Sequence, residues 1–198
     1  MTTRLTRIEQ VERNRVRLLD AARETFLLRG YAGATIDAIA DQAGFSKGVV
    51  YSQFAGKSDL FLALLERRID ERAAENDRVA AQHAGADALG ALMRVNVRHT
   101  VERAGWARLL IEFRVVAARD PALNARYAEL HARSLDRFSR TVEAALRKDG
   151  TTTALAPRTF AQLIFALDSG AVLEQSVDAT AFPLELLDHL LSRLVAPR

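Results

Sequence analysis

The stretch from Thr35 to Phe54 constrains the fold of this chain more than any other segment. Thr35 offers a side-chain oxygen that can cap a helix. The apolar residues after it recur at helical spacing: Ile36, Ile39, Ala40 and Ala43. Gly44 then can adopt the left-handed conformation that ends a helix, and Ser46 is placed to cap a second short helix whose Val50 and Phe54 point inward. Two short helices joined by a glycine-containing turn predict a helix-turn-helix.

The second of these helices has an outer face that suits DNA. Its outward residues are small, cationic or hydroxyl-bearing and include no carboxylate: Lys47, Gly48, Val49, Tyr51 and Ser52. Such a face fits a major groove about 12 Å wide and meets phosphates at the groove edges. An ordinary helical hairpin inside a bundle is the alternative interpretation, and the flanking sequence disfavours it.

The flanking charge supports a polyanionic partner. The net charge of the 198-residue chain is only +3, but it is unevenly distributed. Residues 1–30 hold seven arginines against four acids, and residues 42–58 hold Lys47 and Lys57 and no acid. A basic arm beside an acid-free helix-turn-helix is the charge pattern expected for phosphate contact. For the arm alone, a solvated arginine-rich helix end is an equal alternative.

Composition limits the compartment and the class of protein. About half of the residues (49%) are apolar, so a core can form, yet no run approaches the roughly 18 apolar residues that a membrane span needs. The charged N-terminal stretch is unlike a signal peptide, and cysteine is absent. We therefore expect a cytoplasmic protein with no membrane partner.

Apolar periodicity, interrupted by glycine and proline, predicts helices throughout the chain. The first runs from about residue 9 to 29 and ends at Gly30; its inward stripe is Val16, Leu19, Phe26 and Leu27. Gly105 is expected to separate two later helices. The other expected ranges are about 57–83, 86–104, 106–120, 121–148, from Pro157 onward and from Leu184 onward.

The chain is therefore predicted to be all-α, with two domains. Residues 1–56 form a three-helix DNA-binding domain that contains the helix-turn-helix. Residues 57–198 form a larger helical domain for ligand binding and dimerisation. The helix at about 57–83 is long enough, at roughly 36 Å, to connect the two.

Residues 12–65 resemble the N-terminal region of TetR-family transcriptional regulators. The matching elements are Ala21-Ala22, Phe26, Gly30-Tyr31, Thr35-Ile36, Ile39-Ala40, Ala43-Gly44, Ser46 to Tyr51, Phe54, Lys57 and Leu60. One departure is Gln53, which stands where the family usually has histidine before the phenylalanine. Beyond about residue 80 the resemblance is only that of an all-helical chain.

The resemblance implies roles for individual residues. Lys47, Gly48 and Val49 would face base edges, whereas hydroxyl, amide and lysine groups would hold phosphates. The full predicted DNA-binding set is Thr35, Ser46, Lys47, Gly48, Val49, Tyr51, Gln53 and Lys57. For Tyr51 the alternative is a half-buried core aromatic. The resemblance also implies repression as the default. The residues themselves do not identify the operator or the effector, and they do not distinguish repression from activation.

The last two helices predict a homodimer. The leucines from Leu184 to Leu194 cover nearly two faces of one helix, so one face can pack on its own domain and a second on another chain. A two-fold copy of both helices would form a four-helix bundle, and TetR-like proteins are typically dimers of this kind. Two reading helices related by a two-fold axis match an inverted-repeat operator. The alternative is a last helix buried entirely in its own domain.

Polar residues on apolar rows mark a site for a small hydrophobic effector. The candidates are Asn96, Trp106, Phe113, His131, Phe165, Asp168 and Gln175. Each also has an ordinary structural explanation: a satisfied core amide, a plain core aromatic, or a hydrogen bond across the dimer.

Motifs for catalysis are missing from the sequence. It contains no paired Glu-x-x-His, no His-Glu-x-x-His, no phosphate loop and no glycine-rich dinucleotide fingerprint. We therefore expect no enzyme, no cofactor and no metal. An adaptor that binds only another protein would need the helix-turn-helix to be vestigial. The sequence favours a ligand-responsive transcriptional regulator that a small hydrophobic ligand releases from its operator.

Overall fold

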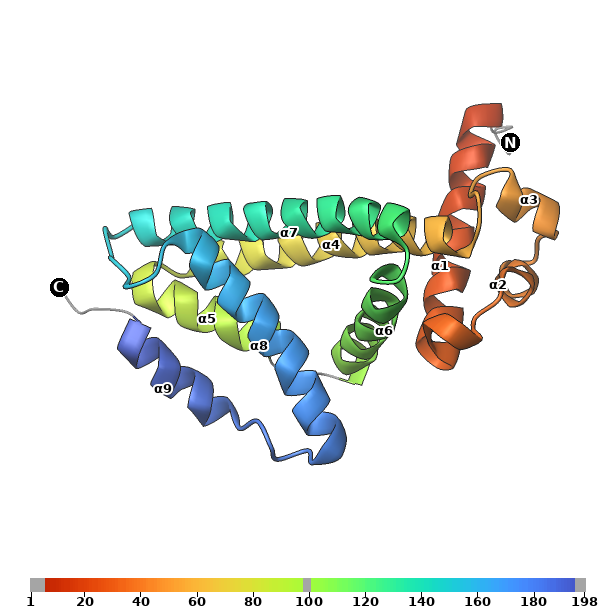
Figure 1. The fold of residues 1–198 in the computed structure, drawn as a ribbon. Coiled ribbons are helices and arrows are strands. Elements are labelled where there is room, and N and C mark those ends of the chain that lie inside the picture. The colour runs from red at the N-terminus through yellow and green to blue at the C-terminus, as the bar shows by residue number, and fades with distance from the viewer. Residues whose placement is uncertain (1–5, 98–100, 195–198) are drawn as a thin grey trace.

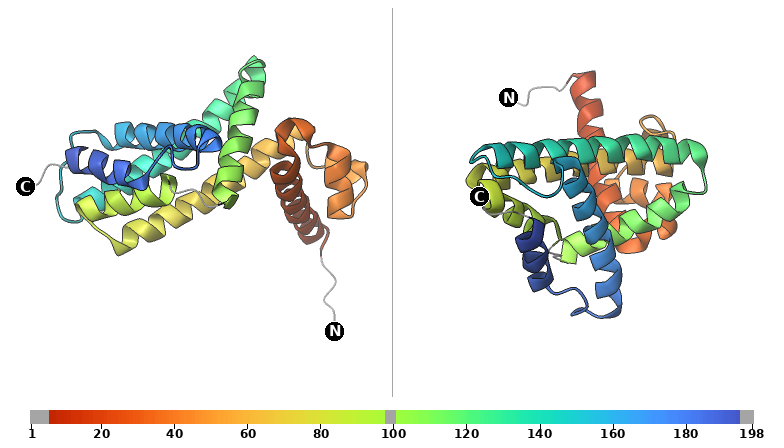
Figure 2. Two further views of the ribbon diagram at one scale, coloured as in Figure 1. Left: turned by 90° about the horizontal axis from the view of Figure 1, so that it is seen from below. Right: turned by 60° about the vertical axis from the view of Figure 1, so that its left-hand side comes forward.

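The computed structural model describes residues 6–97 and 101–194, which form helices and no strand, so the all-α prediction is confirmed. In order, the helices are α1 (Arg7–Gly33), α2 (Ile36–Ala43), α3 (Lys47–Tyr51), α4 (Lys57–Gln82), α5 (Gly85–Val97), α6 (Val101–Ala117), α7 (Pro121–Arg147), α8 (Pro157–Val177) and α9 (Leu184–Leu194). None of these described helices is long and apolar enough to cross a membrane. Helices α1–α3 form a head at one end, and α5, α8 and α9 gather at the other (Figures 1 and 2).

Helix α1 is broken at the predicted glycine. Gly30 has φ of +70°, and one more helical turn follows it. The prediction that Val16 points inward is wrong, because Val16 is 45% exposed. The buried row instead runs at four-residue spacing through Leu18, Ala22 and Phe26, all of them fully buried.

The helix-turn-helix forms as the local sequence predicts. The Thr35 hydroxyl accepts a hydrogen bond from the amide of Ala38 (3.2 Å), and Gly44 ends α2 in the left-handed conformation with φ of +70°. Val50 and Phe54 are buried. Ser46 precedes α3, but its side chain makes no capping hydrogen bond, so the prediction that the Ser46 side chain caps this helix is wrong. Helix α3 begins with a backbone bond from Val49 to Ser46 instead.

Helices α4 and α7 run parallel and in register (Figure 1). Three acids of α4 contact arginines of α7, and every pair is separated by 67 residues: Asp59–Arg126, Glu66–Arg133 and Asp70–Arg137. A constant separation requires two helices that advance in the same direction. The 26 residues of α4 extend about 39 Å from the head into the rest of the molecule.

Helix α6 corrects the expected break at Gly105. The helix continues through this glycine, and the preceding helix α5 already ends at Val97, with residues 98–100 outside the described part of the chain. Helix α6 packs on α1, where a Cβ at position 105 would lie 3.4 Å from Leu27 Cδ2. A side chain at position 105 would make only ordinary contact with Leu27, so this glycine neither ends a helix nor is required by the packing.

Replacement of Gly44 by alanine should destabilise the head. A side chain at a positive φ is strained, so we expect the free energy of unfolding to fall by about 1 kcal/mol in chemical denaturation. Gly33→Ala is the matched control, because its added Cβ would only make ordinary contact with Arg29 (3.6 Å). An equal loss of stability in both variants would contradict the conformational argument.

Candidate DNA-binding surface and ligand cavity

The predicted DNA-binding residues divide into an exposed group and a group turned inward. Thr35, Ser46, Lys47, Gly48 and Tyr51 are exposed on α3 and the start of α2. The Tyr51 ring is 57% exposed, so it lies on the surface and not in the core. The structure thus brings a hydroxyl, an ammonium and a glycine backbone together on one outer face.

A carboxylate lies beside this face. Lys47 Nζ lies 2.6 Å from Asp37 Oδ2 of α2, and the hydrogen bond to Asp37 raises the pKa of Lys47. Helix α3 carries no acid of its own, but its lysine has an acidic partner from the neighbouring helix. Both side chains are more than half exposed, so this ion pair is weak and exchangeable.

Three of the predicted DNA-binding side chains are less exposed to solvent than the others: Val49, Gln53 and Lys57. The Lys57 ammonium donates to three backbone carbonyls after the α1 break, those of Tyr31, Ala32 and Ala34. These bonds use its three N–H donors. Val49 is half-buried against the core. Gln53 is also half-buried, and its Oε1 has no hydrogen-bond partner among the described residues.

Arginines of the basic arm also serve the head itself. Arg17 donates to the carbonyl of Ala43 (2.8 Å) and stacks over Phe45, while Arg15 lies over the Phe54 ring. These contacts hold α1 against the end of α2 and against the chain after α3. These two arginines of the arm therefore hold the segments before and after α3 in place, a role that the net charge of the arm did not indicate.

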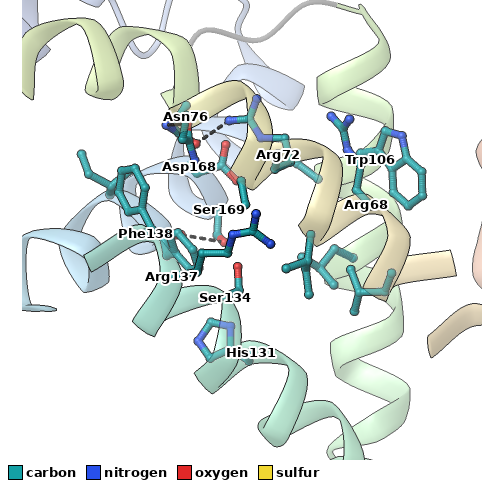
Figure 3. A pocket seen from close by; sticks show the side chains of 18 of the residues that line it. Arg68, Arg72, Asn76, Trp106, His131, Ser134, Arg137, Phe138, Asp168 and Ser169 are labelled. Carbon is teal, nitrogen blue, oxygen red and sulfur yellow. Dashed lines mark hydrogen bonds between the residues drawn. The ribbon is translucent and has the colours of Figure 1, made fainter. Parts of the chain in front are cut away.

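A cavity of about 170 Å³ lies among helices α4, α6, α7 and α8 (Figure 3). Five of the seven predicted effector residues line it: Asn96, Trp106, His131, Phe165 and Asp168. The other two lie elsewhere. Phe113 is fully buried against Phe61, and Gln175 donates to the carbonyl of Phe182 (3.3 Å).

Sequence reasoning missed the arginines of this cavity. Five line it: Arg68, Arg72, Arg103, Arg114 and Arg137. One signal was available for two of them. The inward row of α4 passes from Leu64 and Leu65 to Arg68, Arg72 and Asn76, so cations occupy positions that continue an apolar stripe. The arginines of α6 and α7 carried no comparable signal.

Polar contacts organise the end of the cavity near α5. Arg72 contacts Glu75 (2.6 Å) and hydrogen-bonds the side chain of Asn96, which in turn donates to Asn76 Oδ1 (2.8 Å). Burial lowers the pKa of Arg72 to about 10, which leaves it charged at neutral pH. Figure 3 shows Asn76 and Asp168 beside Arg72.

Two titratable groups in the cavity have shifted pKa values. Burial raises the pKa of Asp168 to about 6, even though Arg72 and other arginines favour its charged form. Burial and then repulsion from Arg114 lower the pKa of His131, so its imidazole is neutral at pH 7.

Both parts of the chain are similar to known bacterial regulators. A family model described as "Bacterial regulatory proteins, tetR family" matches residues 18–64, and one described as "BetI-type transcriptional repressor, C-terminal" matches residues 85–197. The transcriptional activator FasR of Mycolicibacterium smegmatis is 49% identical over 59 residues, which are 30% of this chain and 27% of that protein. The transcriptional repressor AcnR of Corynebacterium diphtheriae is 32% identical over 127 residues, which are 64% and 62%. The chain thus spans less than two thirds of the length of these relatives.

Solved structures show the same fold. A transcriptional regulator from Rhodococcus sp. Rha1 superposes with a TM-score of 0.70 at 28% identity, covering 89% of this chain and 91% of that one. The regulator FadR from Bacillus subtilis, solved in complex with stearoyl-CoA, superposes with a TM-score of 0.66 at 19% identity, covering 91% and 97%. At that identity the second likeness shows the fold alone.

Substitution of Asp168 by asparagine should stabilise the protein at neutral pH. The pKa of Asp168 in the folded state lies above the unfolded value of 3.8, so protonation of this acid increases the free energy of unfolding. This gain is complete below about pH 4 and is lost as the pH rises through about 6. We expect the variant to be more stable at pH 7, by on the order of 2 kcal/mol, and equal to the parent near pH 4. Urea denaturation of both proteins across this range measures the difference. A pH-independent difference would contradict the titration of Asp168.

Proposed function

Because the chain belongs to the TetR family of bacterial transcriptional regulators, we propose that it binds an inverted-repeat operator as a homodimer, represses from it, and leaves it when a small ligand fills the cavity. The observation that carries this proposal is the exposed face of Lys47, Gly48 and Tyr51, held on a buried core by Val50. The apolar cavity walls support a hydrophobic effector. Its relatives include a transcriptional activator and a transcriptional repressor. The proposed cellular location is the cytoplasm, because bacterial DNA lies there.

Helix α4 connects the two sites. Its first half contributes Leu60 and Phe61 to the core of the head, and its second half contributes Arg68, Arg72 and Asn76 to the cavity. A ligand changes DNA affinity only if it prefers one arrangement of the helices. We propose that ligand binding moves α4 and so separates the two heads of the dimer. An equal distance between the Gly48 Cα atoms of DNA-bound and ligand-bound dimers would refute this lever.

The outer face of α8 supports the dimer. Small and apolar residues follow one another there at helical spacing: Ala166, Gly170, Leu173 and Val177. A Cβ added at Gly170 would meet nothing within 4 Å, so this face has room for a second helix. On α9, Leu186 is 40% exposed, whereas the side chains of Leu184, Leu187 and Leu191 lie outside the described residues. The proposed interface is a four-helix bundle of α8 and α9 from both chains.

Replacement of Lys47 by alanine should weaken operator binding. One lost phosphate or base contact costs about tenfold in affinity, and loss of a phosphate contact lowers the slope of log K against log salt by about one. The operator is first selected from a random DNA library, and binding is then followed by fluorescence anisotropy. Arg147→Ala removes the same charge from an exposed position at the far end of α7 and serves as the control. An equal effect of both substitutions would show that only net charge matters.

The double substitution Leu173→Arg with Val177→Arg should produce monomers. Two cations placed in an apolar two-fold interface face their own copies and lose hydration. Light scattering at micromolar concentration should report the mass of one chain in place of two. Val115→Arg, at an exposed apolar position on α6, is the control and should stay dimeric. A parent protein that is already monomeric would overturn the proposed interface.

A further inference from the structure

We infer that the cavity recognises a carboxylic acid with an apolar body, and that Arg114 holds the carboxylate. This inference rests on the proposed function, whose effector it assigns to a chemical class. The sequence alone predicts a small hydrophobic effector, and the inference adds a carboxylate to it.

Arg114 differs from the other cavity arginines in its partners. Its Nε donates to the hydroxyl of Tyr127 (2.5 Å) and its Nη1 to the hydroxyl of Ser169 (3.1 Å). Neither partner is charged, and among the described residues no carboxylate lies within ion-pair distance of Arg114. A guanidinium has five N–H donors, so three remain after these two bonds. Arg114 is thus a half-buried cation with more N–H donors than its neighbours supply acceptors for.

The neighbouring arginines are paired with acids outside the cavity lining. Arg72 and Arg103 both contact Glu75, and Arg137 lies 2.9 Å from Asp70. Arg68 lies 3.5 Å from Glu71. Among the described residues, Asp168 is the acid that lines the cavity, and its charged form is favoured most by Arg72 and next by Arg114. Negative charge therefore compensates the α5 end of the cavity more than the Arg114 end.

Further donors surround the Arg114 end. Tyr127 accepts from Arg114, so its own O–H proton can point to a ligand oxygen. Ser134 and the neutral His131 project from α7 on the side of the cavity opposite Asp168 (Figure 3). Trp106 lines another part of the cavity, beside Arg68, and its buried Nε1 has no hydrogen-bond partner among the described residues. Such an excess of donors calls for an acceptor, and a carboxylate accepts without donating.

The rest of the lining selects an apolar body. Leu65, Ile69, Leu110, Phe138 and Ile164 form walls around a space of about 170 Å³, which holds a molecule far larger than one water. A cation would meet five arginines here, and a neutral hydrocarbon would leave the Arg114 donors without an acceptor. An acid with a hydrocarbon body satisfies both parts of the cavity.

The test compares octanoate with octan-1-ol and octylammonium. Trp106 is the single tryptophan, so its fluorescence reports cavity binding directly. We expect octanoate to bind at least about tenfold more tightly than the alcohol, with no binding of the amine. Arg114→Gln should remove the preference for the acid and leave alcohol binding unchanged. Arg114→Lys should keep part of the preference, which separates a charge effect from a folding defect. Arg137→Gln, which removes a paired arginine, should keep the preference.

Equal binding of octanoate and octanol to the parent protein would overturn the inference. An acid preference that survives Arg114→Gln, or that Arg137→Gln removes equally, would overturn the assignment to Arg114. Operator binding is measured separately in the absence of ligand. A chain that prefers octanoate but binds no DNA would refute the proposed function and leave the carboxylate site standing. A chain that binds its operator but shows no acid preference would refute the carboxylate site and leave the DNA-binding function standing.

Discussion

The packing of aromatic rings around Phe61 fixes the position of the head on the rest of the molecule. Phe61 of α4 contacts Phe26 and Tyr31 of α1 with ring centroids 5.1 and 5.2 Å apart, and Phe113 of α6 at 4.5 Å. Phe113 in turn contacts Tyr127 of α7. Each such pair contributes about 0.5–1.5 kcal/mol beyond the burial of area. Because α2 packs on α1 and α3 packs on α2, the position of the exposed face of α3 depends on this junction.

The same junction places the head next to the cavity. The ring contacts continue from Tyr127 to His131 and Phe165, and both of these line the cavity. On α6, Glu112 accepts a hydrogen bond from the amide of Tyr31 (2.7 Å), directly after the α1 break. Arg114 stands two residues further along the same helix. A shift of α6 caused by cavity contents would therefore act directly on α1.

Features that depend on neighbours in sequence were predictable. The Thr35 cap and the left-handed Gly44 need only a few consecutive residues, and they are found where the sequence places them. The length of α4 followed from its uninterrupted helical pattern. Local reasoning failed where a second helix decided the outcome. Gly105 is predicted to end a helix, but α6 continues through it and packs on α1.

The candidate sites show the same division. The exposed residues of α3 could be found from helical phase alone, whereas Lys57 lies under carbonyls that only the broken end of α1 presents. In the cavity, apolar rows interrupted by Asn96 or Asp168 gave a usable signal. The arginines did not, because whether a cation is paired depends on acids from distant parts of the chain. Glu75, for example, is 28 residues from Arg103 in sequence.

The parallel register of α4 and α7 has an electrostatic consequence. Two parallel helices place their like-charged dipole ends together, about half a positive charge each at one end and half a negative charge at the other. Asp59 and Asp120 stand at the two positive ends, where Asp120 accepts from the amides of Ala122 and Leu123. At the negative end Lys148 donates to carbonyls at the end of α4. Opposite charges at both ends thus offset a repulsion that an antiparallel pair would not have.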